Sequence, residues 1–274
     1  MVRSAIKRPR LLVLSMLSVV LFVLVGRNNV VLKLSARLDL LGKDNVHSLL
    51  CPRPQFSRLS LPATGLASFP GSGNTWVRYL IQEATGILTG SEYNDTQLFE
   101  DAFPAEGNTS TSTILVKTHG SDYRTRQRYS RVILLVRHPK DAILSEFNLF
   151  LGGGHYSVAP EEAYEQHWRS FSEAHASAWY SFHKDWLSYK KPVLVVRYED
   201  VLSNPETQVK RIAEFLQVPI TSRGFDCGMN TSKRFIRNKS RPPLQLYSKR
   251  MATYLDKLYN DTLININKNL IPLQ

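Results

Sequence analysis

Four short apolar segments, separated by stretches of helical character, constrain the fold of this chain most strongly. They cover residues 64–69, 112–118, 131–137 and 192–198, and the last three read STILVKT, RVILLVR and PVLVVRY. Short runs rich in Val, Ile and Leu are typical of strands that are buried on both faces of a parallel sheet. Because parallel neighbours need a crossover, usually a helix, the sequence predicts an α/β fold with helices flanking a mostly parallel central sheet.

Helices are expected in the intervals between these segments. In the first interval Trp76, Leu80 and Glu83 recur at helical spacing. Pro139 and Pro205 stand where two later helices would begin, and proline is well tolerated in a first helical turn. The predicted helices cover residues 75–84, 140–150, 160–189, 205–216 and 244–258.

The N-terminal segment 11–26 carries no charged residue, and Lys7, Arg8 and Arg10 precede it. It is shorter than the roughly 20 residues of an average membrane span, and no A-x-A cleavage site is evident after it. We therefore favour a signal anchor over the alternative, a cleaved signal peptide, and the preceding charges predict a cytosolic N-terminus. The expected organisation is a cytosolic tip at 1–10, a transmembrane anchor at 11–26, a luminal stem at 27–62 and a globular domain at 63–274.

The charge balance points to an anionic partner or to a merely basic surface. Lys and Arg total 35 against 23 Asp and Glu, which gives a formal net charge of +12, and 43% hydrophobic residues suffice for a core. Polyanionic ligands compatible with this excess are a nucleotide, a sulfated or sialylated glycan, and nucleic acid. Nucleic acid is not expected, because the chain lacks the alternation of basic and aromatic residues typical of RNA-binding proteins.

A luminal location leads us to expect two covalent features, a disulfide bond and N-linked glycans. Cys51 and Cys227 are the only cysteines, and in an oxidising lumen they could pair, the alternative being two unrelated thiols. Acceptor triplets for N-linked glycans would also be tolerated in the lumen. These triplets occur at Asn94, Asn108, Asn230, Asn238 and Asn260.

The stretch SFPGSGNTWVRYL, which begins at Ser68, has the pattern of a strand, a glycine-bearing turn and a helix start. Gly71 and Gly73 would let the backbone approach an anion and point its N–H groups inward. Asn74 and Thr75 offer side-chain donors, and the helix directs its positive end to the same point. The stretch therefore predicts a phosphate-binding loop, with an ordinary turn as the alternative.

Polar residues also follow two of the predicted strands. Lys117 and His119 end the strand in LVKTHG, where a histidine can accept a proton and a lysine supplies positive charge, unless both are incidental surface residues. Arg137 ends the next strand, and Ser145 lies two helical turns further on. An Arg and a Ser that converge in this way can grip a phosphate, the alternative being an ion pair between Arg137 and Asp141. All of these residues would lie at the carboxyl ends of the strands, where such sheets bind ligands.

Taken together, PGSGNTW at 70–76, KTH at 117–119 and the pair of Arg137 and Ser145 resemble the sulfotransferases that use 3′-phosphoadenosine-5′-phosphosulfate (PAPS). The resemblance extends from about Ala63 to Leu258 and implies a P-loop-like sulfotransferase fold, with PAPS as the sulfonate donor. No metal is expected, since no carboxylate and Ser/Thr pair is arranged for magnesium after the loop. The resemblance implies that His119 is the base, that Lys117 stabilises charge, and that the donor is bound by Gly71, Ser72, Gly73, Asn74, Thr75, Trp76, Arg137, Ser145, Tyr198 and Arg237.

The match is closer to the WSC-domain-containing sulfotransferases, which are membrane-anchored Golgi proteins that act on sialylated glycans. With two cysteines the chain lacks the cysteine-rich WSC modules themselves. The resemblance implies a single-pass type II protein of the Golgi membrane with a luminal catalytic domain and, by analogy, a homodimer. The acceptor stays open between a sialylated glycan, another glycan and a protein tyrosine.

Two departures from the family pattern matter for function. Gly71 stands where the cytosolic members carry a loop lysine, so the charge must come from elsewhere, with Lys117 as the nearest candidate. The late segment FIRNKSRPP is degenerate and places a glycan acceptor, Asn238, beside Arg237, so we predict that Asn238 is unmodified. The absence of Gly-Lys-Ser/Thr opposes a nucleoside-triphosphate kinase or hydrolase. A catalytically silent luminal binding protein of the same fold remains the alternative.

Overall fold

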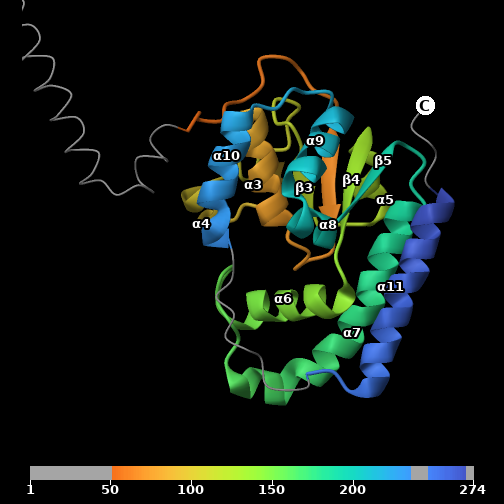
Figure 1. The fold of residues 1–274 in the computed structure, drawn as a ribbon. Coiled ribbons are helices and arrows are strands. Elements are labelled where there is room, and N and C mark those ends of the chain that lie inside the picture. Colours follow the sequence, from red (N-terminus) through yellow and green to blue (C-terminus); the bar gives the residue numbers. More distant parts are fainter. Residues whose placement is uncertain (1–50, 236–245, 270–274) are drawn as a thin grey trace, which may run out of the picture. The chain divides into compact units, whose positions relative to one another are not determined.

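The computed structural model describes residues 51–235 and 246–269, and these contain a five-stranded sheet in the order β2-β3-β1-β4-β5. Every neighbouring pair of strands is parallel, which confirms the predicted parallel sheet (Figure 1). The strand that sequence analysis did not anticipate, β2, has two residues. The bounds are β1 Thr64–Ser68, β2 Gly90–Ser91, β3 Val116–Thr118, β4 Arg131–Val136 and β5 Val193–Arg197.

All five predicted helices are present, and the last one extends to Asn269 instead of ending at 258. The short helices α4, α5, α8 and α10 were not anticipated. The bounds are α3 Asn74–Thr85, α4 Thr96–Asp101, α5 Tyr123–Gln127, α6 Pro139–Leu151, α7 Glu161–Leu187, α8 Tyr198–Ser203, α9 Pro205–Leu216, α10 Ser222–Thr231, the 3₁₀ turn η1 Ser232–Phe235 and α11 Lys249–Asn269.

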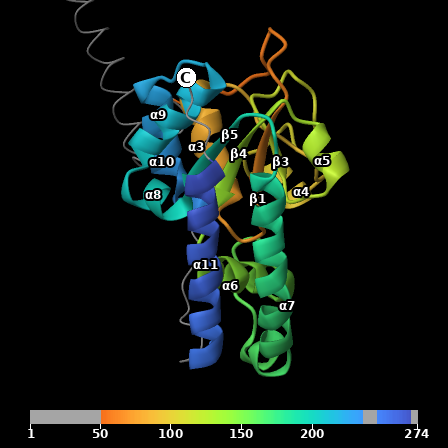
Figure 2. The same cartoon turned by 90° about the vertical axis from the view of Figure 1, so that its right-hand side faces the viewer.

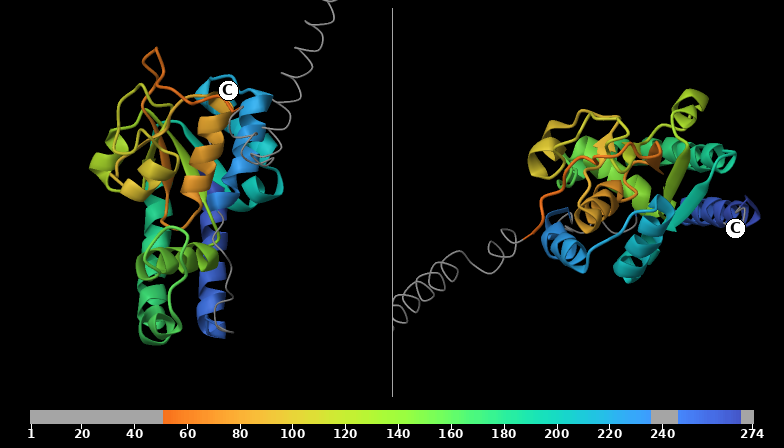
Figure 3. Two further views of the ribbon diagram at one scale, coloured as in Figure 1. Left: turned by 90° about the vertical axis from the view of Figure 1, so that its left-hand side faces the viewer. Right: turned by 90° about the horizontal axis from the view of Figure 1, so that it is seen from above.

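Strand β4, which lies beside the central strand β1, contributes to both layers of the hydrophobic core. Its side chains alternate between the two faces of the sheet, as strand geometry requires. Val132, Leu134 and Val136 pack in a cluster with residues of α6, α7 and α11, including Phe147 and Trp179. Ile133 and Leu135 pack on the other face, in a cluster with residues of α3, α9 and α10. Figures 2 and 3 show that α7 and α11 run on past the sheet and that α6 lies below the ends of the strands, beside these two helices.

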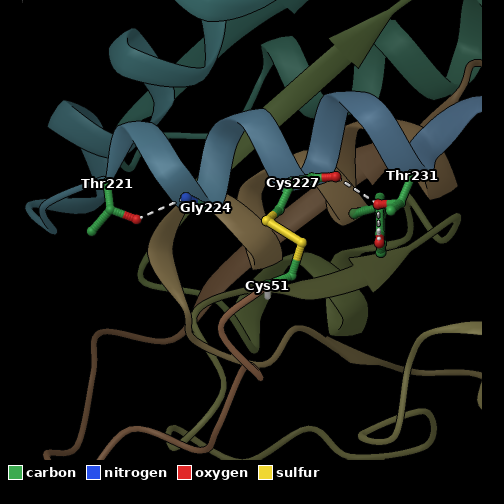
Figure 4. The surroundings of a disulfide bond; sticks show 6 residues. Cys51, Thr221, Gly224, Cys227 and Thr231 are labelled. Carbon is green, nitrogen blue, oxygen red and sulfur yellow. Dashed lines mark hydrogen bonds between the residues drawn. A yellow bond between two sulfur atoms is a disulfide. The ribbon is translucent and has the colours of Figure 1, made fainter. Parts of the chain in front are cut away.

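A disulfide between Cys51 and Cys227 fastens the first described residue to α10 (Figure 4). Near this bond, Thr221 caps the N-terminus of α10 by accepting from the Gly224 N–H, and the Thr231 hydroxyl donates to the Cys227 carbonyl. Residues 55–61 are hydrogen-bonded to the domain as well, through the backbone of residues 86–88 and 111–112. The described end of the predicted stem is therefore held against the domain.

No helix within residues 51–235 and 246–269 is long and apolar enough to cross a membrane. The predicted anchor at 11–26 lies outside the described residues, as do Arg237 and Asn238.

The disulfide should contribute substantially to stability, because its cysteines are 176 residues apart in sequence. Cross-linking distant residues restricts the unfolded chain, and native disulfides typically contribute about 2–4 kcal/mol. We predict that the paired variant Cys51→Ser/Cys227→Ser loses about this much free energy of unfolding in urea titrations. Cys227→Ser alone should lose a similar amount. A paired variant as stable as the wild type would contradict the prediction.

Candidate functional site

The turn between β1 and α3 is a loop that only glycine can form at two positions. Gly71 and Gly73 have φ angles of +75° and +88°. A Cβ atom at Gly71 would lie 2.2 Å from the backbone oxygen of Ala142 in α6, and one at Gly73 would lie 2.2 Å from the ring of Tyr198. The absence of a lysine at position 71 therefore has a physical cause: the loop is pressed against α6 and leaves no room for any side chain.

The N-terminus of α3 has the features of an anion-binding site. The helix has 12 residues, and its N-cap, Gly73, provides no side-chain hydrogen bond to the first-turn N–H groups. Those groups, with the positive end of the helix dipole, favour an anion. Ser72 is completely buried, and its hydroxyl has no hydrogen-bond partner in the described part of the chain. Buried hydroxyls are normally hydrogen-bonded, so this one indicates that a ligand or water completes the loop.

Two of the loop residues that sequence analysis assigned to the donor have structural contacts in the domain. The Asn74 amide donates to the Leu66 carbonyl at 3.1 Å and to the Ser68 hydroxyl at 3.1 Å, so it ties the loop to β1. Trp76 is partly buried and packs edge-to-face with Tyr198, with ring centroids 5.8 Å apart. These two rings form the aromatic side of the loop.

His119 follows β3 directly and is oriented by β1. Its Nδ1 lies 2.7 Å from the Ser68 carbonyl oxygen, which can only accept, so Nδ1 carries the proton. The other ring nitrogen, Nε2, has no hydrogen bond to any residue that the structure describes and keeps its lone pair. Burial, with the positive charge of Lys117, lowers the pKa of His119 to about 3. The imidazole is therefore neutral, with Nε2 available as a base.

Lys117 and His119 share one aromatic wall, Tyr93, which sequence analysis missed. The Tyr93 ring stacks on the His119 ring, with centroids 5.3 Å apart, and its hydroxyl accepts from the His119 backbone N–H at 2.8 Å. The Lys117 ammonium lies 5.5 Å from the centre of the same ring. Burial, reinforced by the charge of Arg78, lowers the pKa of Lys117 to about 8. Tyr93 follows a two-residue strand, and no sequence signal marked it.

Arg137 and Ser145 meet at the loop, as the sequence pattern predicted. Arg137 donates to the Gly71 carbonyl at 2.8 Å, and its guanidinium lies 4.5 Å from the ring centre of Tyr198. A Cβ at Gly71 would lie 3.1 Å from the Ser145 Cβ, so α6 brings this serine to the same point. Arg137 forms no ion pair with Asp141, so that alternative is not what the structure contains.

An ion pair beneath the site was also missed by sequence analysis. Arg78, in the second turn of α3, pairs with Glu106, and both side chains are completely buried. The Arg78 guanidinium lies 3.7 Å from the ring centre of Phe103. The only signal in the sequence was a single arginine inside the apolar pattern of the helix. Its partner is 28 residues away and could not be identified from spacing.

The structure shows how exposed the predicted glycan acceptors are, and it can be searched for groups of metal-binding side chains. Asn94, Asn230 and Asn260 are exposed and Asn108 is partly buried; Asn230 lies in α10 and Asn260 in α11. Within residues 51–235 and 246–269, no group of three or more His, Cys, Asp or Glu side chains is arranged to hold a metal ion.

Comparisons with known proteins agree with this architecture. Residues 62–240 match the family described as "Sulfotransferase domain". WSCD family member CG9164 of Drosophila melanogaster is 41% identical over 188 residues, which cover 66% of this chain and 59% of that protein. WSCD family member AAEL009094 of Aedes aegypti is 39% identical over 201 residues, which cover 71% of this chain and 63% of that protein. The chain thus spans less than two thirds of the length of these relatives.

Among solved structures, the crystal structure of mouse sulfotransferase SULT7A1 complexed with PAP matches with a TM-score of 0.51 and 17% identity, covering 78% of this chain and 88% of that one. At this identity the likeness shows the fold. The structure confirms the predicted parallel sheet flanked by helices and the predicted glycine turn between a strand and a helix, and it adds that this strand, β1, is the central one.

The packing of Gly71 against α6 can be tested by a pair of substitutions. Gly86, at the end of α3, has a similar φ of +67° but no atom within 4 Å of a built Cβ. We predict that Gly86→Ala lowers the free energy of unfolding by about 1–2 kcal/mol, the cost of the left-handed conformation. Gly71→Ala should cost about 1–3 kcal/mol more, because its Cβ also collides with the α6 backbone. Equal losses in urea titrations would contradict the contact.

Proposed function

We propose that this chain, which belongs to the sulfotransferase family, transfers a sulfonate group from PAPS to a hydroxyl of a glycan. The observation that carries the proposal is an imidazole with a free Nε2 that lies beside a glycine loop suited to an anion. The mouse sulfotransferase SULT7A1, which shares the fold, was crystallised with PAP, the nucleotide that remains after transfer, and this supports PAPS as the donor.

The residues around the loop fit a nucleotide of this kind. The unpartnered Ser72 hydroxyl and the first-turn amides of α3 suit the 5′-phosphosulfate. Arg137 and Ser145 suit the 3′-phosphate, because charge-assisted hydrogen bonds from arginine bind phosphate well. Tyr198 and Trp76 offer ring faces for the adenine. The family resemblance adds Arg237 to this set.

In the proposed mechanism, Nε2 of His119 accepts the proton of the acceptor hydroxyl as the hydroxyl oxygen forms its bond to sulfur. The bond between sulfur and the bridging phosphate oxygen breaks at the same time. Lys117 and the loop amides stabilise the negative charge that develops on this leaving oxygen, in water-poor surroundings where such charges count most. The donor supplies the activated sulfonate, and the protein contributes position, a base and positive charge.

The low pKa of His119 is compatible with this role. Desolvation causes much of the shift, and the positive charge of Lys117 adds to it. An anion bound beside Lys117 offsets that charge and so raises the pKa of His119. The imidazole therefore becomes a stronger base when the donor is present, which is when a base is needed.

The cellular setting and acceptor extend the proposal. The resemblance to the WSC-domain branch supports a Golgi membrane protein of type II, anchored through residues 11–26, with a sialylated glycan as the first acceptor to test. Glycosylation at Asn94, Asn108, Asn230 and Asn260, and a homodimer, belong to the same proposal. A panel that includes other glycans and a tyrosine peptide would identify the acceptor class.

A second candidate function is a catalytically silent binding protein of the same fold. The observation that favours it is Gly71, since the loop cannot carry the lysine of the cytosolic members. Such a protein would bind adenosine 3′,5′-bisphosphate without transferring sulfonate. Incubation of the luminal protein with radiolabelled PAPS and the acceptor panel separates the two functions.

If His119 is the base, substituting it should lower the rate of sulfonate transfer without weakening nucleotide binding. His119→Ala should lower sulfonate transfer by about 10²–10⁴-fold, the usual contribution of a general base. Its affinity for adenosine 3′,5′-bisphosphate, measured by calorimetry, should change little, because the imidazole does not hold the nucleotide. His183→Ala is a control, since that buried imidazole lies in the core on α7. A near-normal rate of sulfonate transfer by His119→Ala would show that His119 is not the base.

The pKa of Lys117 predicts how transfer depends on pH. The ammonium is charged below about pH 8 and loses its proton as the pH rises through that value. If its charge binds and stabilises the donor, kcat/KM for the donor, which reports pKa values of the free enzyme, should fall above about pH 8 in the wild type. Lys117→Arg should lack this decline, because a guanidinium stays protonated, although its different shape lowers the plateau. An identical alkaline decline in both proteins would contradict the assignment.

A further inference from the structure

We infer that Arg78 is a positioning residue: by holding the Glu106 carboxylate, it leaves the Lys117 ammonium without a carboxylate partner and available to an anion in the site. The identity of that anion, the transferring sulfonate and its leaving oxygen, rests on the proposed function. The ionic arrangement itself does not depend on it.

The first step is the ion pair between Arg78 and Glu106. Both side chains have no exposed surface, so water cannot replace either partner. Removing one partner of such a pair leaves an uncompensated buried charge, which is strongly unfavourable. The Arg78 guanidinium is also held against the Phe103 ring at 3.7 Å. Arg78 therefore fixes the Glu106 carboxylate in one place.

The second step is the isolation of Lys117. Its side chain is 5% exposed, and its ammonium forms no hydrogen bond or ion pair with any residue that the structure describes. Two carboxylates, Glu106 and Asp95, are close enough that their charges raise the pKa of Lys117. Asp95 pairs with His155, with Oδ2 of Asp95 2.6 Å from Nε2 of His155. Asp95 also caps α4 by accepting a hydrogen bond from the Leu98 N–H. Both carboxylates near the lysine are thus bonded to other residues.

The third step compares this arrangement with the alternative. A buried lysine beside a free carboxylate would form an ion pair and lose its attraction for a ligand anion. Arg78 prevents this pairing by Glu106, and its own charge also acts on Lys117 and His119. Position 71 admits no side chain, so the loop cannot supply a lysine there. Lys117 of β3 then provides the positive charge beside His119.

The remaining groups that face Lys117 do not supply a negative charge. His119, on the same strand, carries a lowered pKa and is neutral. Tyr93 presents its ring face, and burial raises the pKa of its hydroxyl, so it stays protonated. Besides burial, which lowers the pKa of Lys117 most, Arg78, Glu106 and Asp95 are therefore the charges that act on this lysine.

The test measures Lys117 directly and needs no enzymatic activity. Lysines of the luminal protein are ¹³C-methylated, and the NMR signal of Lys117 is assigned by its loss in Lys117→Arg and followed through a pH titration. In Arg78→Met the pKa should move upward from about 8, since a repelling cation is lost and Glu106 is released. In Glu106→Gln it should move downward, since an attracting anion is lost. The double variant should lie between the two.

A surface pair provides the matched control. Lys210 and Glu206 form an exposed ion pair, so Glu206→Gln should shift the titration of Lys210 much less than Glu106→Gln shifts that of Lys117. Folding of each variant is checked by circular dichroism. Should Arg78→Met not fold, Glu106→Gln decides the test alone. A Lys117 titration that stays in place, or that moves in the opposite direction, overturns the inference.

Transfer assays then separate this inference from the proposed function. The rate of sulfonate transfer by Arg78→Met should fall by up to about 10²–10³-fold, which is typical of removing one charge-stabilising donor. The double variant Arg78→Met/Glu106→Gln should recover part of this loss. If the Lys117 titrations move as expected while the wild type transfers no sulfonate to any acceptor, the positioning role stands and the proposed function fails.

Discussion

The contact between the Gly71 turn and the backbone of α6 is the constraint on which the rest of the site depends. It brings the loop after β1, the end of β4 and the first turns of α6 to one point, where Arg137 and Ser145 meet the loop. The closeness of this contact also removes any side chain from position 71. As a consequence, the loop offers backbone N–H groups but carries no cationic side chain at position 71.

Besides Arg137, positively charged side chains near the loop come from β3 and α3. Lys117 extends from β3, and Arg78 lies one turn into α3, with Glu106 as its counterion. This arrangement is costly, because buried charges are stable only when paired or when a ligand completes them. A folded protein that keeps a buried ammonium without a carboxylate partner among its described residues has the electrostatics of a binding site, not of an ordinary core.

Much of the fold could be predicted because it depends on local pattern. Runs such as RVILLVR have the apolar character of buried strands, and Pro139 and Pro205 do begin helices. The glycine loop was also recognisable from its spacing. Features set by tertiary contact were not: β2 has two residues and no periodicity, and Arg78 finds Glu106 across 28 residues. The inward-facing amide of Asn74 belongs to the same class, since nothing in a sequence tells which way a polar side chain turns.

The tautomer of His119 follows from the pairing of strands in the sheet. In the parallel pairing of β1 with β3, Ala67 lies opposite Thr118, so the next residues along the two strands, Ser68 and His119, are brought beside each other. The carbonyl of Ser68 can only accept a hydrogen bond, and it therefore fixes the proton on Nδ1 of His119. A shift of one residue in this register would remove the carbonyl and leave the tautomer undetermined. The hydrogen-bonded ladder that holds the core together thus also leaves Nε2 of this imidazole free to act as a base.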